Sequence, residues 1–450
     1  MEKAKDVIEE VERINREYNY FNNISSELAL EQEKALSSEP KGRLYGYFIS
    51  VKDCICVRGV ESRAGSSILS GYKPVFDATV IEKVKQEGGI IIGKTSQDAF
   101  GFGSFSVNVG LDMKIPLNPF DKERCCGGSS GGSAGITQKA SFRHISLAES
   151  TGGSIVCPAS FCGVIGLCPT YGRVSRYGLI DYANSLDKIG VMAKSVNDIA
   201  LMMEIITGHD PKDSTSLDVP VPKYRDFVGP DIKGMKIGII KDFFSDVVDS
   251  EVVDNVEEGI SRLESEGAKI DKISLPLNQR YSVPTYYLLA MAEASTNLAR
   301  FCGMRYGAFE KLDGRFNEYF TRVRSKYFNE ESKRRIIIGT FARMAGYRDA
   351  YYIKATKVRT TLIREYKIAF KKFDLLVSPT MPFVAPRFSE IEKLTPLQSY
   401  MSDIITVGPN LAGLPHITIP VKKDKMPVGL MLIANHLEEG KLIQAGAKLE

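Results

Sequence analysis

The chain has 450 residues, of which 43% are hydrophobic and 25% charged, a composition typical of a globular protein rather than a disordered or fibrous one. Its net charge of +4 is too small to indicate a nucleic-acid-binding surface. The charged N-terminal segment does not resemble a signal peptide, no apolar run is long enough to span a bilayer, and eight cysteines are too few for a disulfide scaffold. We therefore expect a cytoplasmic protein with reduced thiols and no membrane association.

Hydrophobic periodicity predicts helices and strands that alternate along the chain. Apolar residues at helical spacing predict helices, and alternating or short continuous apolar runs predict strands. Helices are expected around 4–14, 26–36, 79–87, 195–206, 251–266, 285–301 and 349–372. Strands are expected at 45–57, 90–92, 145–148, 235–240, 269–273, 374–377, 416–421 and 428–434.

This order of elements is typical of an α/β fold in which a buried sheet is covered by helices. We expect a single domain over residues 1–450, with N-terminal helices in 1–40 and a core from about 44 to 450. Residues 208–232 form the most linker-like stretch. Ser195 is expected to cap the helix that follows it, with Asp198 at the capping-box position.

Cysteine and histidine spacing does not indicate a metal site. The eight cysteines lack zinc-ribbon spacing, and the four histidines form no His-Glu-x-x-His pair. Because a buried cysteine is usually a small hydrophobic side chain, we expect no bound metal.

Two Gly/Ser-rich segments, 127–133 and 150–154, carry the strongest functional signal. Glycine lets the backbone approach a ligand closely, and serine supplies a hydroxyl that can act as a nucleophile or relay a proton. Backbone N–H groups beside such a serine can stabilise an oxyanion. The combination indicates an acyl-transfer site.

Three other interpretations of these segments are weaker. A flexible linker is disfavoured because well-patterned elements flank the segments. A phosphate-binding loop would need a lysine after the glycines, or a Gly-x-Gly-x-x-Gly pattern, and neither is present in this stretch. An α/β-hydrolase elbow would need a glycine two residues after Ser154, where the chain has Val156.

Lys52 is the candidate base for such a serine. Few histidines are available, and lysine is the usual substitute for histidine, but it acts as a base only when burial lets it lose its proton. Lys52 lies in the apolar segment 47–53. The alternative is a lysine at a sheet edge whose amine reaches solvent.

The segments 50–53, 127–133 and 151–155 resemble, in the same order, the three catalytic segments of the amidase signature family. Within that family, further segments resemble the glutaminase chains of glutamine-dependent aspartyl/glutamyl-tRNA amidotransferases: 162–167, 169–179, 185–187, 292–295, 297–298, 305–307, 333–336, 339–341 and 349–352. The resemblance runs from about residue 44 to the C-terminal end. It implies an amidase-signature α/β fold with a large mixed sheet covered by helices on both faces.

The resemblance also implies the catalytic roles. Ser154 would be the nucleophile, Ser129 a relay with unusual peptide geometry, and Lys52 the base. The oxyanion hole would be formed by the backbone N–H groups of Thr151, Gly152, Gly153 and Ser154.

Glutamine, the implied substrate, carries two further charges. Arg335, with Arg334 as the adjacent candidate, is expected to bind its α-carboxylate, because a guanidinium binds a carboxylate bidentately. Asp403 is expected to bind the α-ammonium, and Tyr286 to line the pocket. Position alone favours a surface ion pair for each charged residue, and the resemblance reverses this preference.

The implied activity is hydrolysis of glutamine, with the ammonia passed to a kinase and tRNA-binding partner, the B subunit. That partner would hold MgATP and convert Glu-tRNA(Gln) or Asp-tRNA(Asn), tRNA would contact mainly this partner, and a small C subunit would complete the complex. No cofactor is expected in this chain. Two alternatives remain: a stand-alone amidase acting on small amides, and a non-catalytic scaffold.

The chain departs from the family pattern beside the nucleophile. Many members have an aspartate where this chain has Ser150 and an arginine where it has Val156, and Cys302 replaces another aspartate. None of these changes removes Lys52, Ser129 or Ser154.

Overall fold

A single mixed sheet runs through the molecule. The computed structural model describes residues 2–38, 41–244, 248–422 and 426–450, so residues 1, 39 and 40 of the predicted N-terminal region lie outside it. Within the described residues, eleven strands are joined in the order β1-β3-β2-β4-β6-β5-β10-β11-β9-β7-β8. They are β1 (Phe21–Ile24), β2 (Phe48–Lys52), β3 (Ile90–Thr95), β4 (His144–Ser150), β5 (Ile165–Cys168), β6 (Lys188–Ala193), β7 (Lys236–Ile240), β8 (Lys269–Ile273), β9 (Leu375–Pro379), β10 (His416–Lys422) and β11 (Val428–Ala434).

The direction of the strands confirms the predicted mixed sheet. Strand β2 is parallel to β3 and β4, and β7 is parallel to β8 and β9. The other neighbouring pairs are antiparallel.

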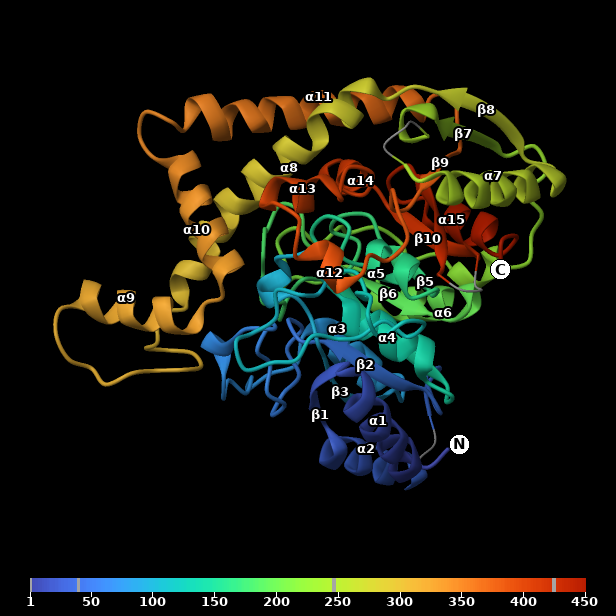
Figure 1. Ribbon diagram of the computed structural model, residues 1–450. Coiled ribbons are helices and arrows are strands. Elements are labelled where there is room, and N and C mark those ends of the chain that lie inside the picture. The colour runs from blue at the N-terminus through green and yellow to red at the C-terminus, as the bar shows by residue number, and fades with distance from the viewer. Residues whose placement is uncertain (1, 39–40, 245–247, 423–425) are drawn as a thin grey trace.

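Helices connect and cover these strands (Figure 1). They are α1 (Ala4–Tyr18), α2 (Ser26–Ser38), α3 (Thr79–Gln86), α4 (Gly131–Lys139), α5 (Val156–Phe161), α6 (Val196–Ile206), α7 (Ser250–Ser265), α8 (Pro276–Asn297), α9 (Phe316–Tyr327), α10 (Glu330–Arg343), α11 (Lys354–Ala369), α12 (Phe388–Ile391), α13 (Pro396–Met401), α14 (Val407–Leu411) and α15 (Glu439–Gly446). Figure 1 shows α9 and α10 projecting to one side of the body. None of the helices in the described ranges is long and apolar enough to cross a membrane.

Both faces of the sheet are buried. Successive side chains of a strand point to opposite faces, and those of β2 and β3 alternate between two apolar clusters. Ile49 and Ile91 belong to the cluster that contains the buried residues of α3 and α6. Phe48 and Ile90 belong to the cluster that contains those of α1. The helices therefore cover the sheet on both sides, as predicted.

Several predicted helices differ in their bounds. Helix α8 begins at Pro276 and continues through Pro284, whereas the sequence predicted a start at 285. A π-helical turn, Asp349–Ile353, precedes α11 in the region predicted as one helix. Ser195 caps α6 as predicted, since its side chain accepts a hydrogen bond from the backbone N–H of Asp198 at 3.1 Å.

Hydrogen bonds hold the linker-like stretch 208–232 against the rest of the protein. The carboxylate of Asp210 accepts hydrogen bonds from the Thr79 and Ser175 hydroxyls, both at 2.6 Å. Arg173 donates to the carbonyl of Pro220 at 2.8 Å. Long-range polar contacts, which proline-rich composition does not reveal, hold this irregular segment in place.

Candidate active site

The carboxyl ends of two neighbouring parallel strands bring distant segments together. Strand β2 ends at Lys52, and β4 ends at Ser150, just before the turn that carries Ser154. Val51 of β2 is paired with Leu147 of β4, so the two ends lie at the same edge of the sheet. This edge is where α/β proteins commonly bind ligands.

Lys52 is fully buried at this edge and contacts Ser129. Its Nζ donates hydrogen bonds to Ser129 Oγ at 2.8 Å, to the backbone carbonyl of Glu149 at 2.9 Å and to Glu149 Oε2 at 2.8 Å. The peptide bond between Gly128 and Ser129 is cis. The structure thus brings Lys52 and Ser129 into direct contact and adds a carboxylate.

The turn that carries Ser154 is tightly enclosed. A Cβ on Gly152 would lie 2.9 Å from the Tyr286 hydroxyl, and a Cβ on Gly153 would lie 2.5 Å from Thr406 Oγ1. Only glycine fits these positions without displacing a neighbour. Ser154 itself is 6% exposed, and among the described residues its hydroxyl makes no hydrogen bond. It is therefore available to a substrate.

The departures from the family pattern are accommodated locally. The Ser150 hydroxyl donates to the carbonyl of Gly152 at 3.1 Å, within the same turn. Val156 is fully buried at the start of α5 and packs with apolar side chains. Cys302 is partly exposed beyond α8.

Arg335 of α10 is buried, and rings surround it. Its Nε donates to Glu331 Oε1 and its Nη1 to the Tyr182 hydroxyl, both at 2.7 Å. The guanidinium carbon lies 5.1–5.7 Å from the ring centroids of Phe102, Tyr182, Tyr287 and Tyr400. The neighbouring Arg334 side chain is 40% exposed and pairs with the other oxygen of Glu331. Of the two arginines, only Arg335 points inward.

Asp403 is a buried acid close to Arg335. Its Oδ2 accepts hydrogen bonds from the Tyr287 hydroxyl at 2.6 Å and from the Ser104 hydroxyl at 2.9 Å. Burial raises the pKa of Asp403 above its usual range. Because the ring of Tyr287 also faces Arg335, one tyrosine contacts both charged groups.

Tyr286 and Tyr182 connect the charged groups Arg335 and Asp403 to the region of Lys52, Ser129 and Ser154. Tyr286 covers Gly152, and its ring centroid is 4.9 Å from that of Tyr287, which binds Asp403. On the other side, a Cβ on Gly101 would lie 3.6 Å from Ser129 Oγ and 3.5 Å from the ring of Tyr182. The predicted site residues thus form one neighbourhood.

A pocket of about 660 Å³ opens beside this neighbourhood. Its lining includes Ser104, Glu331, Arg334, Arg335 and Tyr400, together with apolar residues of the loop after β3 and of α12. A substrate entering here would meet the guanidinium of Arg335.

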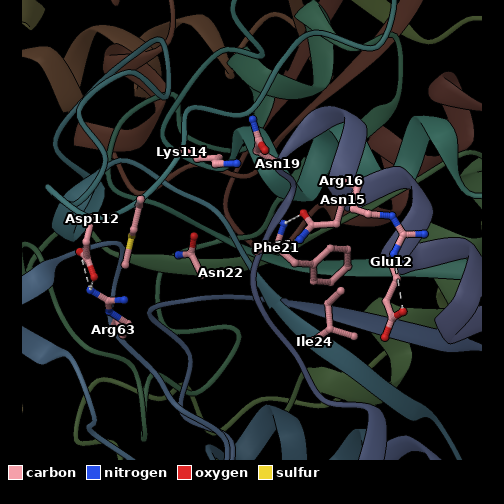
Figure 2. A pocket seen from close by; sticks show the side chains of 11 residues that line it. Glu12, Asn15, Arg16, Asn19, Phe21, Asn22, Ile24, Arg63, Asp112 and Lys114 are labelled. Carbon is pink, nitrogen blue, oxygen red and sulfur yellow. Dashed lines mark hydrogen bonds and ion pairs between the residues drawn. The ribbon is translucent and has the colours of Figure 1, made fainter.

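Another pocket, of about 470 Å³, lies against α1 and β1, and none of the predicted site residues lines it. Figure 2 shows Arg63 paired with Asp112 at one end, Arg16 paired with Glu12 at the other, and Asn15 bound to the backbone of Phe21 between them. Asn22 donates to Asp53, the residue after Lys52, at 3.0 Å. The described residues contain no cluster of His, Cys, Asp and Glu that could hold a metal ion.

The sequence analysis missed several residues of the site, chiefly Glu149, Tyr287 and Asp187, whose Oδ1 lies 2.8 Å from the Thr151 hydroxyl. Glu149 had a detectable signal, because it follows the predicted strand at 145–148 and a buried lysine needs an acidic or polar partner. Tyr287 had none, since tyrosines in a long helix usually pack in the core.

Comparisons with known proteins show the family to which the chain belongs. The family model described as Amidase matches residues 2–443. The chain is 45% identical to the A subunit of the glutamyl-tRNA(Gln) amidotransferase of Koribacter versatilis, over 99% of this chain and 94% of that protein. The solved structure of the corresponding A subunit from Thermotoga maritima superposes with a TM-score of 0.82 at 34% identity, over 99% of this chain and 90% of that one.

A peptide amidase from Stenotrophomonas maltophilia is also similar, with a TM-score of 0.81 at 26% identity over 99% of this chain and 92% of that one. The chain therefore belongs to the amidase family.

Proposed function

We propose that this chain is the glutaminase component of a tRNA-dependent amidotransferase, which releases ammonia from glutamine for a partner protein. The names of its relatives support this proposal. The observation that carries it is the composition of the site. A buried lysine–serine pair and a serine-bearing glycine turn share a neighbourhood with the buried guanidinium of Arg335 and the buried carboxyl group of Asp403.

The proposed reaction begins with Ser154 Oγ attacking the side-chain amide carbon of glutamine. The proton of Ser154 passes to Ser129, and the proton of Ser129 passes to Lys52 Nζ, which is 2.8 Å from Ser129 Oγ. Ammonia leaves with a proton, and water then hydrolyses the glutamyl ester. The developing oxyanion would be stabilised by the backbone N–H groups of Thr151, Gly152, Gly153 and Ser154.

The same site offers a partner for each charge of the substrate. Two nitrogens of Arg335 are used by Glu331 and Tyr182, whereas Nη2 makes no hydrogen bond among the described residues. We expect Nη2 to bind the α-carboxylate and Asp403 to bind the α-ammonium. Tyr286, which lies over the glycine turn, would close the pocket between them.

The chemistry that consumes ammonia is assigned to partners. A B subunit with MgATP would activate the carboxyl group of Glu-tRNA(Gln) or Asp-tRNA(Asn), and a small C subunit would complete the complex. The sequence of this chain has neither a phosphate-binding loop motif nor a basic stripe, which supports placing ATP and most tRNA contacts on the partner.

The test is transamidation by the assembled complex. Ser154→Ala should abolish the glutamine-dependent reaction and leave the reaction with added ammonium salt intact. Retained glutamine-dependent activity would refute Ser154 as the nucleophile.

The likeness to a peptide amidase favours a stand-alone amidase as the second candidate. Strong glutamine turnover by the purified chain, unaffected by partner proteins or tRNA, would favour that candidate. No turnover of glutamine by the complete complex would instead favour a scaffold.

A further inference from the structure

Glu149 is a buried acid in direct contact with the amine of Lys52. It lies near the end of β4, beside the end of β2, and its side chain is 4% exposed. Its Oε2 and its backbone carbonyl both accept hydrogen bonds from Lys52 Nζ. The third contact of this nitrogen is Ser129 Oγ at 2.8 Å, whose hydroxyl donates to Nζ when Lys52 is the neutral amine. Glu149 therefore orients Nζ toward Ser129.

A hydrogen-bond network supports the other oxygen of Glu149. The Thr151 hydroxyl lies 2.8 Å from Glu149 Oε1 and 2.8 Å from Asp187 Oδ1. The Thr151 hydroxyl has one proton, so it can donate a hydrogen bond to only one of these two carboxyl groups. The other carboxyl group must carry a proton of its own and donate it to the hydroxyl oxygen. Burial, and next the charge of Glu149, raise the pKa of Asp187 well above its usual range. This direction favours placing the shared proton on Asp187.

The other titratable groups around Lys52 do not replace Glu149. Asp98 is held by backbone N–H groups, and burial raises its pKa to about 6. Asp53 faces Lys94, with 3.7 Å between Oδ1 and Nζ. Burial raises the pKa of the Cys54 thiol well above its usual range, so Cys54 is neutral. Glu149 is the carboxylate in contact with the Lys52 amine.

We propose that Glu149 is a positioning residue for Lys52, whose carboxylate stabilises the ammonium formed as Ser154 attacks. The inference rests on the proposed serine–lysine chemistry. As the Ser154 Oγ–carbon bond forms, Ser129 gains the proton of Ser154 and loses its own to Lys52. Lys52 changes from amine to ammonium while Glu149 stays a carboxylate. The arrangement parallels the aspartate that orients and stabilises histidine in serine proteases.

This arrangement has two opposing effects on activity. The carboxylate favours the ammonium in the transition state, which raises the maximum rate. A carboxylate in contact with an amine also favours the ammonium before the reaction, so removing it should move the pH dependence of activity to lower pH. A residue that only filled space would change the maximum rate without moving the pH dependence.

The test uses covalent labelling of Ser154 by phenylmethanesulfonyl fluoride, followed by mass spectrometry of the full-length protein across a range of pH. In this reaction Ser154 Oγ bonds to sulfur, fluoride leaves, and the proton travels through Ser129 to Lys52. Glutamine hydrolysis is measured in parallel. Labelling without hydrolysis would refute the proposed substrate, while the labelling profile would still decide the role of Glu149.

In Glu149→Gln we expect the rise of labelling with pH to move to lower pH by about 1–3 units, the effect of losing a charge in contact. The plateau rate should fall about 10- to 100-fold, as expected for one charge-assisted hydrogen bond. Glu204→Gln is the matched control. Like Glu149, Glu204 has a buried side chain, 6% exposed, and it is paired with basic residues, Arg43 and Arg225. It should leave both quantities unchanged.

If the labelling rate of Glu149→Gln rises over the same pH range as that of the wild type, the proposal is overturned, whatever the plateau rate. If Glu149→Gln does not fold, Glu149→Asp carries the test. The shorter side chain moves the carboxylate away from Lys52 by one carbon, so the rise of labelling should shift to lower pH by a smaller amount. An unchanged pH dependence of labelling would again overturn the proposal.

Discussion

Replacing Asp403 by asparagine separates substrate recognition from structure. Asp403 is buried and accepts hydrogen bonds from the Tyr287 and Ser104 hydroxyls. An asparagine can keep both contacts, because a hydroxyl can donate to its Oδ1 or accept from its Nδ2. We therefore expect the free energy of unfolding to change by less than about 1 kcal/mol.

The effect on glutamine should be much larger. A hydrogen bond between the substrate ammonium and a carboxylate contributes about 1.5–3 kcal/mol, which corresponds to about a 10- to 150-fold rise in KM when the charge is removed. Because burial raises the pKa of Asp403, the binding form is lost as the pH falls through a value above the usual range of an aspartate. The KM of the wild type should therefore rise on acidification, and that of Asp403→Asn should not.

The assay is steady-state release of ammonia by the assembled complex from glutamine and from glutaramate, which has the same amide but no α-ammonium. Asp403→Asn should raise KM for glutamine and leave KM for glutaramate unchanged. An equal effect on the two substrates, or none on glutamine, would refute the assignment of Asp403 to the ammonium.

Two further predictions concern stability and geometry. Burial lowers the pKa of His144 to about 3 from 6.5, so the unfolded chain binds a proton that the folded chain does not, and stability is lost as the pH falls through 6.5 toward 3. His144→Phe should remove about 1.4 kcal/mol per pH unit of this slope between pH 6 and 4 in urea unfolding, and parallel curves for variant and wild type would contradict this. In Gly128→Ala, the new Cβ would lie 2.3 Å from Asp98 Oδ2, so Ser129 must move. Glutaminase activity should fall by about 100-fold, whereas Gly229→Ala, with no atom within 4 Å of its Cβ, should be silent; equal activities would show that the turn tolerates the methyl group.

Helices and strands in which apolar residues recur at regular spacing could be predicted from the sequence. The helices α1, α3 and α7 and the strands β3, β7, β8 and β11 have apolar residues at regular spacing, and their bounds lie near those predicted. Helix α4 was not predicted, because Gly131–Lys139 is rich in glycine and serine and has no apolar stripe. Strand β6 was missed because Lys188–Ala193 begins with a buried lysine and Gly190 interrupts its apolar residues.

The residues of the candidate site likewise fall into those that the sequence predicted and those that only the structure could distinguish. Short motifs around Lys52, Ser129 and Ser154 are local in sequence, so they could be recognised in a single chain, and with them the amidase family. Whether Arg334 or Arg335 faces inward could not be decided, because the two are adjacent and identical in type. The tertiary structure distinguishes them by enclosing Arg335 among four aromatic rings.

The sequence by itself determined the class of fold and the family, and it predicted a site at the Gly/Ser segments and Lys52. Only the tertiary structure decided what surrounds that lysine. Strands β2 and β4 are separated by about ninety residues of sequence and become neighbours because burying both faces of the sheet selects one order of strands. That order places Glu149 against Lys52, a contact that depends on long-range packing.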